Sequence, residues 1–183
     1  LRMLGVEFTV LHGNVDESPL AGESPEAYAL RLSEAKARAV AATRPGRWVL
    51  GADTIVTIDG ELLGKPATRD EARCMIRKLS GRAHTVITAF TLFNSEQAEP
   101  IRRAVSSQVL FKEIPEDELE WYVATDEPYD KAGGYAVQGK AAVLVSEVHG
   151  SWTNVVGLPL CEVVEALKGL GLADFTRRDA CPR

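Results

Sequence analysis

A single acidic residue interrupts the apolar run at the start of VLGADTIVTIDGELLGKP, residues 49–66. A carboxylate inside a strand-like pattern is energetically costly unless it is paired, bound to a metal or placed in a cleft. Strand alternation puts this residue, Asp53, on one face with Ile55 and puts Thr54 on the other face. Asp53 is therefore a candidate catalytic carboxylate, although a hydrogen-bonded structural Asp at a strand end fits the pattern equally well.

Two more acidic residues and two lysines are candidates for the same site. Glu17 follows Asp16 in VDES, a turn-like stretch between a predicted strand and a predicted helix, and loops often carry functional side chains. Lys65 stands in a Gly-Lys-Pro turn and Lys36 on a predicted helix. An ammonium group is a good phosphate partner. Taken singly, each of these residues is more simply interpreted as part of a solvated surface.

The segment EPYDKAGGYAVQG, residues 127–139, combines glycines with charged and amide side chains. Glycines let the backbone approach a ligand closely, and Gln138 offers an amide donor and acceptor suited to the edge of a base. We favour a binding loop over a flexible surface loop here, and assign Asp130 and Lys131 no catalytic step.

Together these groups could perform one kind of chemistry. Two or three carboxylates could hold Mg²⁺ or Mn²⁺, which prefer oxygen ligands, while two lysines bind a polyphosphate and an amide reads a base. This is the equipment for metal-assisted attack of water on a phosphoanhydride.

Alternating strands and helices must position these residues. Strand patterns occupy residues 8–11, 47–58, 83–94, 101–114 and 141–150, and helical patterns occupy residues 24–42, 68–81, 115–125 and 158–171. Ser24 and Thr68 are expected helix caps, and Asp59-Gly60 predicts a hairpin turn. Residues 126–140 have no clean period and residues 150–157 read as a loop. The mixture predicts an α/β or α+β protein with a mixed sheet.

The composition limits the possible partners and the compartment. The chain has 183 residues, enough for one domain. A formal net charge of -5 argues against a nucleic-acid polymer as partner, and no apolar stretch approaches the roughly 20 residues of a membrane span. The cysteines are odd in number without metal-ligand spacing, which favours a reducing cytoplasm: Cys74, Cys161 and Cys181. We expect Cys74 and Cys161 to be core thiols.

Five motifs in chain order resemble those of the Maf family of nucleoside triphosphate pyrophosphatases: VDES, GADTIV with LGKP, LSGRAHTVITA, EPYDKAGGYAVQG and GSWTNVVGLPL. The resemblance covers residues 1–171, so we expect a single Maf-like domain over residues 1–172 and a C-terminal tail over residues 173–183. It implies an α/β fold of the Maf/inosine triphosphatase type. In that fold a twisted mixed sheet flanked by helices forms two lobes around a cleft, usually in a homodimer.

The resemblance also implies an activity. Family members hydrolyse a nucleoside triphosphate to the monophosphate and pyrophosphate with a divalent metal cation, Mg²⁺ or Mn²⁺. The form EPYDKAGGYAVQG is similar to that of the branch acting on dTTP and UTP. It therefore implies these substrates, together with modified pyrimidine nucleotides in a cytoplasmic house-cleaning role.

Roles transfer to single positions by the same resemblance. Asp53 matches the proton acceptor and a metal contact, and Glu17 matches a metal-binding acid. The positions matching phosphate-binding lysines and residues tied to base specificity are Lys36, Lys65, Thr54 and Gln138.

One departure from the family leaves alternatives open. Family members begin with a strand and a Ser-Ala-Ser-Pro-Arg-Arg-like loop that contacts the triphosphate, and this sequence starts just after that point. We expect the strand and loop to be missing from the sequence rather than from the native protein. The alternatives are a catalytically impaired nucleotide-binding regulatory protein, a metal-dependent phosphomonoesterase and a division-linked interaction protein. Release of pyrophosphate from a nucleoside triphosphate would distinguish a pyrophosphatase from these three alternatives.

Overall fold

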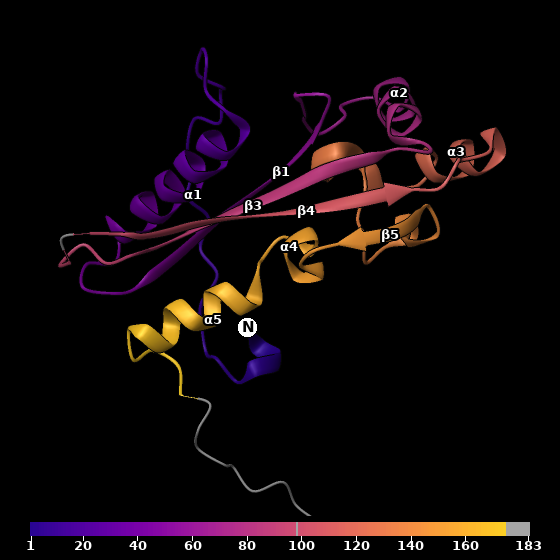
Figure 1. The fold of residues 1–183 in the computed structure, drawn as a ribbon. Coiled ribbons are helices and arrows are strands. Elements are labelled where there is room, and N and C mark those ends of the chain that lie inside the picture. The colour runs from indigo at the N-terminus through magenta and orange to yellow at the C-terminus, as the bar shows by residue number, and fades with distance from the viewer. Residues whose placement is uncertain (98, 175–183) are drawn as a thin grey trace, which may run out of the picture.

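The structure, a computed structural model, describes residues 1–97 and 99–174, and these form an open sheet with helices on both sides (Figure 1). The sheet has five strands in the order β2-β1-β3-β4-β5. The strands are β1 (Val49–Ile58), β2 (Glu61–Leu63), β3 (Ala83–Phe93), β4 (Ile101–Phe111) and β5 (Val145–His149). The α-helices are α1 (Pro25–Ala41), α2 (Arg69–Leu79), α3 (Glu116–Val123), α4 (Trp152–Val156) and α5 (Leu160–Gly169). Short 3₁₀ helices are η1 (Arg2–Leu4), η2 (Glu127–Asp130), η3 (Ala132–Gly134) and η4 (Lys140–Val143).

The α/β class is confirmed, but every strand pairing among the described residues is antiparallel. The expected mixed sheet therefore differs from the structure in strand direction. The reason is that each strand starts at the end of the sheet where its neighbour stopped. The segment through α2 returns the chain to the end of β1, so that Thr85 pairs with Thr57. A residue pattern alone does not show where such a connection returns the chain.

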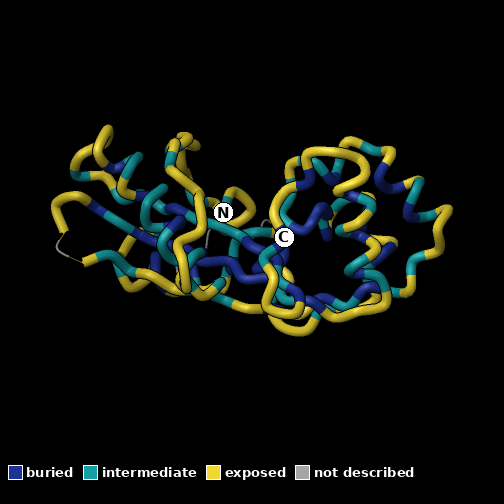
Figure 2. The backbone as a smooth tube through the Cα atoms, turned by 90° about the horizontal axis from the view of Figure 1, so that it is seen from above, coloured by how far each residue is buried: buried dark blue, intermediate teal, exposed yellow. Residues whose placement is uncertain are grey.

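The long strands join two halves of the molecule, which Figure 2 shows as two rounded bodies of chain. In one half, α1 packs on one face of the sheet through Ala29, and α5 packs on the other through Val163. In the other half, α2 and α3 share a larger core with residues of the segment 132–144. Asp53 lies on β1 between these halves, which agrees with the expectation of two lobes. No helix in the described part of the chain combines the length and apolar character required to cross a membrane.

Local signals in the sequence place the main elements correctly. The Ser24 hydroxyl accepts a hydrogen bond from the Ala27 amide at 3.2 Å and begins α1, and Thr68 caps α2 in the same way. Asp59 and Gly60 both have positive φ, 54° and 78°, which is the primed turn that matches strand twist in a two-residue hairpin.

Three predicted segments differ from the structure. The described residues from 6 to 20 lie outside any helix or strand, so the strand expected at 8–11 is wrong. This segment runs along a hollow beside β1, and without a neighbour at hydrogen-bonding distance an alternating pattern does not make a strand. Residues 141–150 are expected to form a buried strand, but the strand is limited to β5 and the residues before it form η4. None of the five residues of β5 is buried, because β5 is an edge strand. The loop expected at 150–157 contains α4, which Ser151 caps.

The two cysteines expected in the core are exposed. On α2 the buried stripe includes Ala72 and Ile76, and Cys74 lies halfway between them. Cys161 precedes the buried Val163 by two positions on α5. Residues two apart on a helix point to different sides, so both thiols face solvent. Cys181 and most of the expected tail lie outside the described residues.

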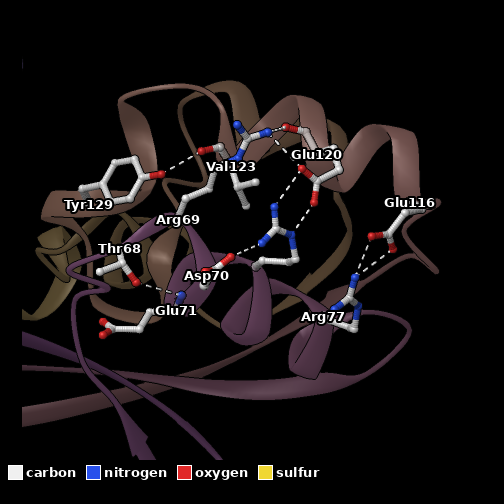
Figure 3. A network of polar contacts seen from close by, with 10 residues as sticks. Thr68, Arg69, Asp70, Glu71, Arg77, Glu116, Glu120, Val123 and Tyr129 are labelled. Atoms are coloured by element: carbon white, nitrogen blue, oxygen red, sulfur yellow. Dashed lines mark hydrogen bonds and ion pairs between the residues drawn. The ribbon is translucent and has the colours of Figure 1, made fainter.

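A network of ion pairs ties α2 to α3 (Figure 3). Arg69 and Arg73 both donate to the carboxylate of Glu120, and Arg77 donates to Glu116 at 2.7 Å. The guanidinium of Arg73 lowers the pKa of Glu120 to about 2. Because exposed pairs contribute little free energy, we assign the stability of this half to the core beneath and the alignment of the two helices to the network.

Helix α1 approaches β1 unusually closely at Gly51. A Cβ atom on Gly51 would lie 2.3 Å from the Ser33 carbonyl oxygen and 2.7 Å from the Ala37 amide nitrogen. Beside this contact, the buried hydroxyls of Ser33 and Thr91 lie 2.8 Å apart. The absence of a side chain at Gly51 thus sets how far α1 stands from the strand that carries Asp53.

Replacing Gly51→Ala is expected to lower the free energy of unfolding by about 1–3 kcal/mol or more, because the added methyl group must push α1 backbone away. Urea denaturation would measure the change. Gly169→Ala is the matched control, since a Cβ there meets no atom within 4 Å. Equal stability of the two variants would contradict the close-packing argument.

Candidate active site

The ammonium of Lys36 joins two carboxylates from different parts of the chain. Its Nζ lies 2.6 Å from Oδ1 of Asp53 on β1 and 2.7 Å from Oε1 of Glu17 in the loop before α1. The Asp53 side chain is 10% exposed and that of Glu17 is 50% exposed. The cluster is therefore reachable from solvent on the side of Glu17 and enclosed on the side of Asp53.

Contacts to α1 fix the loop that carries Glu17. The Tyr28 hydroxyl donates to the Glu17 carbonyl oxygen at 2.7 Å, and Arg31 donates to the Ser18 carbonyl oxygen at 3.1 Å. Asp16, the other acid of VDES, accepts a hydrogen bond from the Ser18 amide at 2.9 Å. Asp16 thus shapes the turn, while Glu17 points to Lys36.

The cluster separates the proton affinities of its two acids. Burial raises the pKa of Asp53, and the hydrogen bond and charge of Lys36 oppose this only in part. The hydrogen bond from Lys36 lowers the pKa of Glu17. Burial would lower the pKa of Lys36, but its bonds to Asp53 and Glu17 outweigh burial and raise it. Asp53 is therefore the more basic carboxylate, held beside a firmly protonated lysine.

Lys65 reaches the cluster through its charge rather than through contact. Its ammonium contributes to lowering the pKa of Glu17 and that of Asp130, and it partly offsets the raised pKa of Asp53. The Gly133 amide donates to the Gly64 carbonyl oxygen at 3.0 Å, which links the turn before Lys65 to the 127–139 segment. The fourth predicted charged residue thus lies close to the other three.

Thr54 and Gln138 line a separate hollow of about 420 Å³, here called the Thr54–Gln138 pocket, together with Tyr135 and Gly157. Thr54 follows Asp53 on β1 but points to the opposite face, as alternation requires. The Tyr135 hydroxyl lies 2.7 Å from Nε2 of the buried His84.

A second and larger hollow of about 1910 Å³ lies between residues 1–14 and β1. Glu17 and Lys36 line it, and so does Gly157, which also lines the Thr54–Gln138 pocket. Asp53 and Lys65 line neither hollow. The six predicted residues therefore fall into a charged cluster of four and a neutral pair in an adjoining pocket, rather than into one cavity.

Glu127 is a site-supporting residue that the sequence analysis did not identify. Its carboxylate accepts hydrogen bonds from the Lys140 amide at 2.7 Å, the Ala141 amide at 3.0 Å and the Tyr122 hydroxyl at 3.1 Å. A Cβ on Gly139 would lie 2.1 Å from this carboxylate. Glu127 thereby ties together the two ends of the segment that carries Gln138. The only signal in the sequence is an acid at one end of a glycine-rich stretch and a glycine at the other.

The donor set of the cluster fits a hard divalent cation bound together with a substrate. No group of three or more His, Cys, Asp or Glu side chains able to hold a metal occurs within residues 1–97 and 99–174. Glu17 and Asp53 nevertheless converge on one point, now taken by the Lys36 ammonium. Mg²⁺ commonly binds through one or two carboxylates and completes its shell with phosphate oxygens and water.

Known proteins resemble this chain along nearly its whole length. The family model described as Maf-like protein matches residues 1–170. A protein named dTTP/UTP pyrophosphatase from Syntrophus aciditrophicus is 52% identical over 96% of this chain and 86% of its own length. Proteins of the same name from Geobacter sulfurreducens and Geobacter sp. (strain M21) are 49% and 48% identical, each over 93% of this chain and 90% and 89% of their own lengths.

Replacing Lys36→Met is expected to raise the pKa of Asp53 further, because burial then acts without the opposing hydrogen bond. A raised folded-state pKa means that the folded state holds more protons than the unfolded state, so the contribution of Asp53 to stability falls as pH rises through that window. Carbon-13 NMR titration of the carboxyl groups would measure the pKa.

Lys65→Met is the matched control, since Lys65 acts on Asp53 through charge alone and should give a smaller upward shift. An unchanged Asp53 titration in the Lys36 variant would contradict the proposed coupling.

Proposed function

The chain belongs to the Maf family, and from this premise we propose that it is a nucleoside triphosphate pyrophosphatase acting on dTTP and UTP. The products are the nucleoside monophosphate and pyrophosphate. Modified pyrimidine triphosphates are included as substrates in a house-cleaning role. The names of the relatives support this substrate class.

The observation that carries the proposal is the position of Lys36 between Glu17 and Asp53. A lysine held by two carboxylates offers a cation for phosphate at the same place as acids for a metal and for a proton. In this proposal the Lys36 ammonium binds the triphosphate in place of a carboxylate, and Lys65 contacts the phosphates from the other side of the cluster.

The chemical step is hydrolysis at the α-phosphorus. The oxygen of a water molecule forms a bond to the α-phosphorus, and the bond between that phosphorus and the oxygen bridging to the β-phosphorus breaks. Pyrophosphate leaves with the bonding electron pair, and the carboxylate of Asp53 accepts the proton from water. Its raised pKa supports this role, because a base works best when its pKa lies nearer the working pH.

Glu17 and Asp53 would hold a divalent cation, Mg²⁺ or Mn²⁺, together with phosphate oxygens. When bound, the cation supplies charge stabilisation to the phosphoryl oxygens. The residues of the chain orient the reacting groups: Lys36 and Lys65 bind phosphate, and Asp53 holds the proton that water releases.

Base recognition is assigned to the Thr54–Gln138 pocket. Gly157 lines both this pocket and the larger hollow that reaches Lys36, so a nucleotide bound here would lie near the charged cluster. We also propose that the protein acts in the cytoplasm and forms a homodimer. Light scattering of the purified protein would test the dimer.

The function is tested with a panel of nucleotides and identification of the products. With Mg²⁺ or Mn²⁺ present, the full-length protein is expected to release pyrophosphate from dTTP and UTP, and a chelator should stop the release. Binding without release would instead indicate a regulatory protein. Orthophosphate released from a monophosphate would indicate a phosphomonoesterase.

Replacing Asp53→Asn is expected to leave nucleotide binding largely intact and to lower kcat by about 10²–10⁴-fold, the usual contribution of a general base. Asparagine keeps an oxygen that can accept the Lys36 hydrogen bond, so the change removes mainly the proton acceptor. Steady-state kinetics with UTP, together with calorimetric binding, would measure both quantities.

Asp16→Asn is the matched control, because Asp16 bonds to the Ser18 amide outside the cluster and asparagine can still accept that bond. Near-normal turnover in the Asp53 variant would exclude Asp53 as the base.

A further inference from the structure

We propose that buried Thr88 fixes the proton of the Thr54 hydroxyl, so that Thr54 can only accept a hydrogen bond from a ligand in the Thr54–Gln138 pocket. A base that presents an N–H group there, as uracil and thymine do at N3, is then preferred to cytosine, whose N3 accepts. Thr88 is thus a positioning residue for specificity. The inference rests on the proposed function for the identity of the ligand, and it depends on two residues that the sequence analysis did not single out, Thr88 and Asn154.

The chain of hydrogen bonds begins at the pocket and ends at a backbone carbonyl. Thr54 and Thr88 are directly opposite each other on β1 and β3, and their hydroxyl oxygens are 2.9 Å apart. The Thr88 hydroxyl lies 2.9 Å from the Asn154 carbonyl oxygen. Thr88 and Asn154 are both fully buried, so bulk water does not compete for these bonds.

Counting protons gives the direction of each bond. A carbonyl oxygen has no proton, so the contact between Thr88 and Asn154 requires the single hydroxyl proton of Thr88. The Asn154 carbonyl has two lone pairs and accepts the Gly157 amide at 2.9 Å with the other. Having donated its proton, Thr88 can only accept from Thr54. The Thr54 proton therefore points inward, and the Thr54 oxygen presents lone pairs to the pocket.

The Asn154 side chain holds in place the carbonyl group at the end of this series of hydrogen bonds. Its Oδ1 accepts from the Thr88 amide at 3.0 Å, and its Nδ2 donates to the Val86 carbonyl oxygen at 3.0 Å and to the Ser107 hydroxyl at 2.9 Å. A backbone amide can only donate and a carbonyl can only accept, so these partners fix the orientation of the side-chain amide. The acceptor that takes the Thr88 proton is thus anchored to both β3 and β4.

The consequence for a bound base follows from matching donors and acceptors. The N3–H group of uracil or thymine can donate to the Thr54 oxygen, whereas the N3 lone pair of cytosine would face another lone pair. An unmatched buried polar group costs more than the average hydrogen bond contributes. Gly157 leaves room for this contact, since a Cβ there would lie 3.5 Å from the Thr54 hydroxyl oxygen.

The decisive experiment compares kcat/KM for UTP and CTP in variants of the full-length protein. Thr88→Val keeps the shape and removes the inward acceptor, so the Thr54 proton can turn to the pocket and meet the N3 of cytosine. We expect the UTP-to-CTP ratio to fall by about tenfold or more, as one mismatched hydrogen bond allows. Thr88→Ser keeps the hydroxyl and should retain the wild-type ratio.

Thr91→Val is the matched control on the same strand. Thr91 is buried and its hydroxyl bonds to Ser33, which itself donates to the Leu30 carbonyl oxygen at 2.9 Å. The loss of a buried hydroxyl pair is therefore comparable, but Thr54 is not involved. The ratio should stay at the wild-type value even where thermal stability falls.

An unchanged ratio in Thr88→Val, or an equal fall in Thr88→Ser, would overturn the inference. If Thr88→Val does not fold, Thr54→Val decides: we expect the UTP-to-CTP ratio to fall, and an unchanged ratio overturns the inference. Wild-type protein that releases pyrophosphate from neither nucleotide contradicts the proposed function instead. In that case calorimetric affinities for UTP and CTP in the same variants still test the role of Thr88.

Discussion

The close contact of α1 with β1 at Gly51 determines the geometry of the charged cluster. A side chain at Gly51 would enter the backbone of α1, so the helix that carries Lys36 lies directly against the strand that carries Asp53. The same helix holds the Glu17 loop through Tyr28. One packing constraint thus brings together three charged groups that are far apart in the sequence, and the high cost of burying Asp53 is offset by the lysine beside it.

Strand alternation divides the proposed chemistry from the proposed recognition. Asp53 and Thr54 are neighbours in the chain but face opposite sides of β1, one toward α1 and the other toward α4. On the first side the important contacts are between full charges. On the second side they are between neutral hydroxyl, amide and carbonyl groups, where direction rather than charge discriminates between ligands. If the two functional residues were two positions apart on the strand instead of adjacent, their side chains would lie on the same face and this separation would be lost.

The sequence supports prediction where a signal is local. Helix caps at Ser24 and Thr68 and the Asp59-Gly60 turn form as predicted, because each depends on residues within one turn of chain. The grouping of Glu17, Lys36 and Asp53 was expected from the motifs. Strand direction, the exposed cysteines and the absence of a strand at residues 8–11 depend on what lies next to each segment in space. The roles of Glu127 and Thr88 depend on single hydrogen bonds between distant residues, and no residue pattern encodes their direction.

The carboxylate of Glu127 accepts hydrogen bonds from the backbone amides of residues 140 and 141, so the two ends of the intervening segment are held at a fixed distance. A residue inserted between them would have to bulge toward the sheet or break these hydrogen bonds. Natural length variation should therefore be tolerated between β3 and β4, where residues 95–97 and 99 are exposed, and rejected between residues 128 and 139. Changes in the sequence would therefore have to preserve the number of residues in this stretch as well as Gln138 and Gly139.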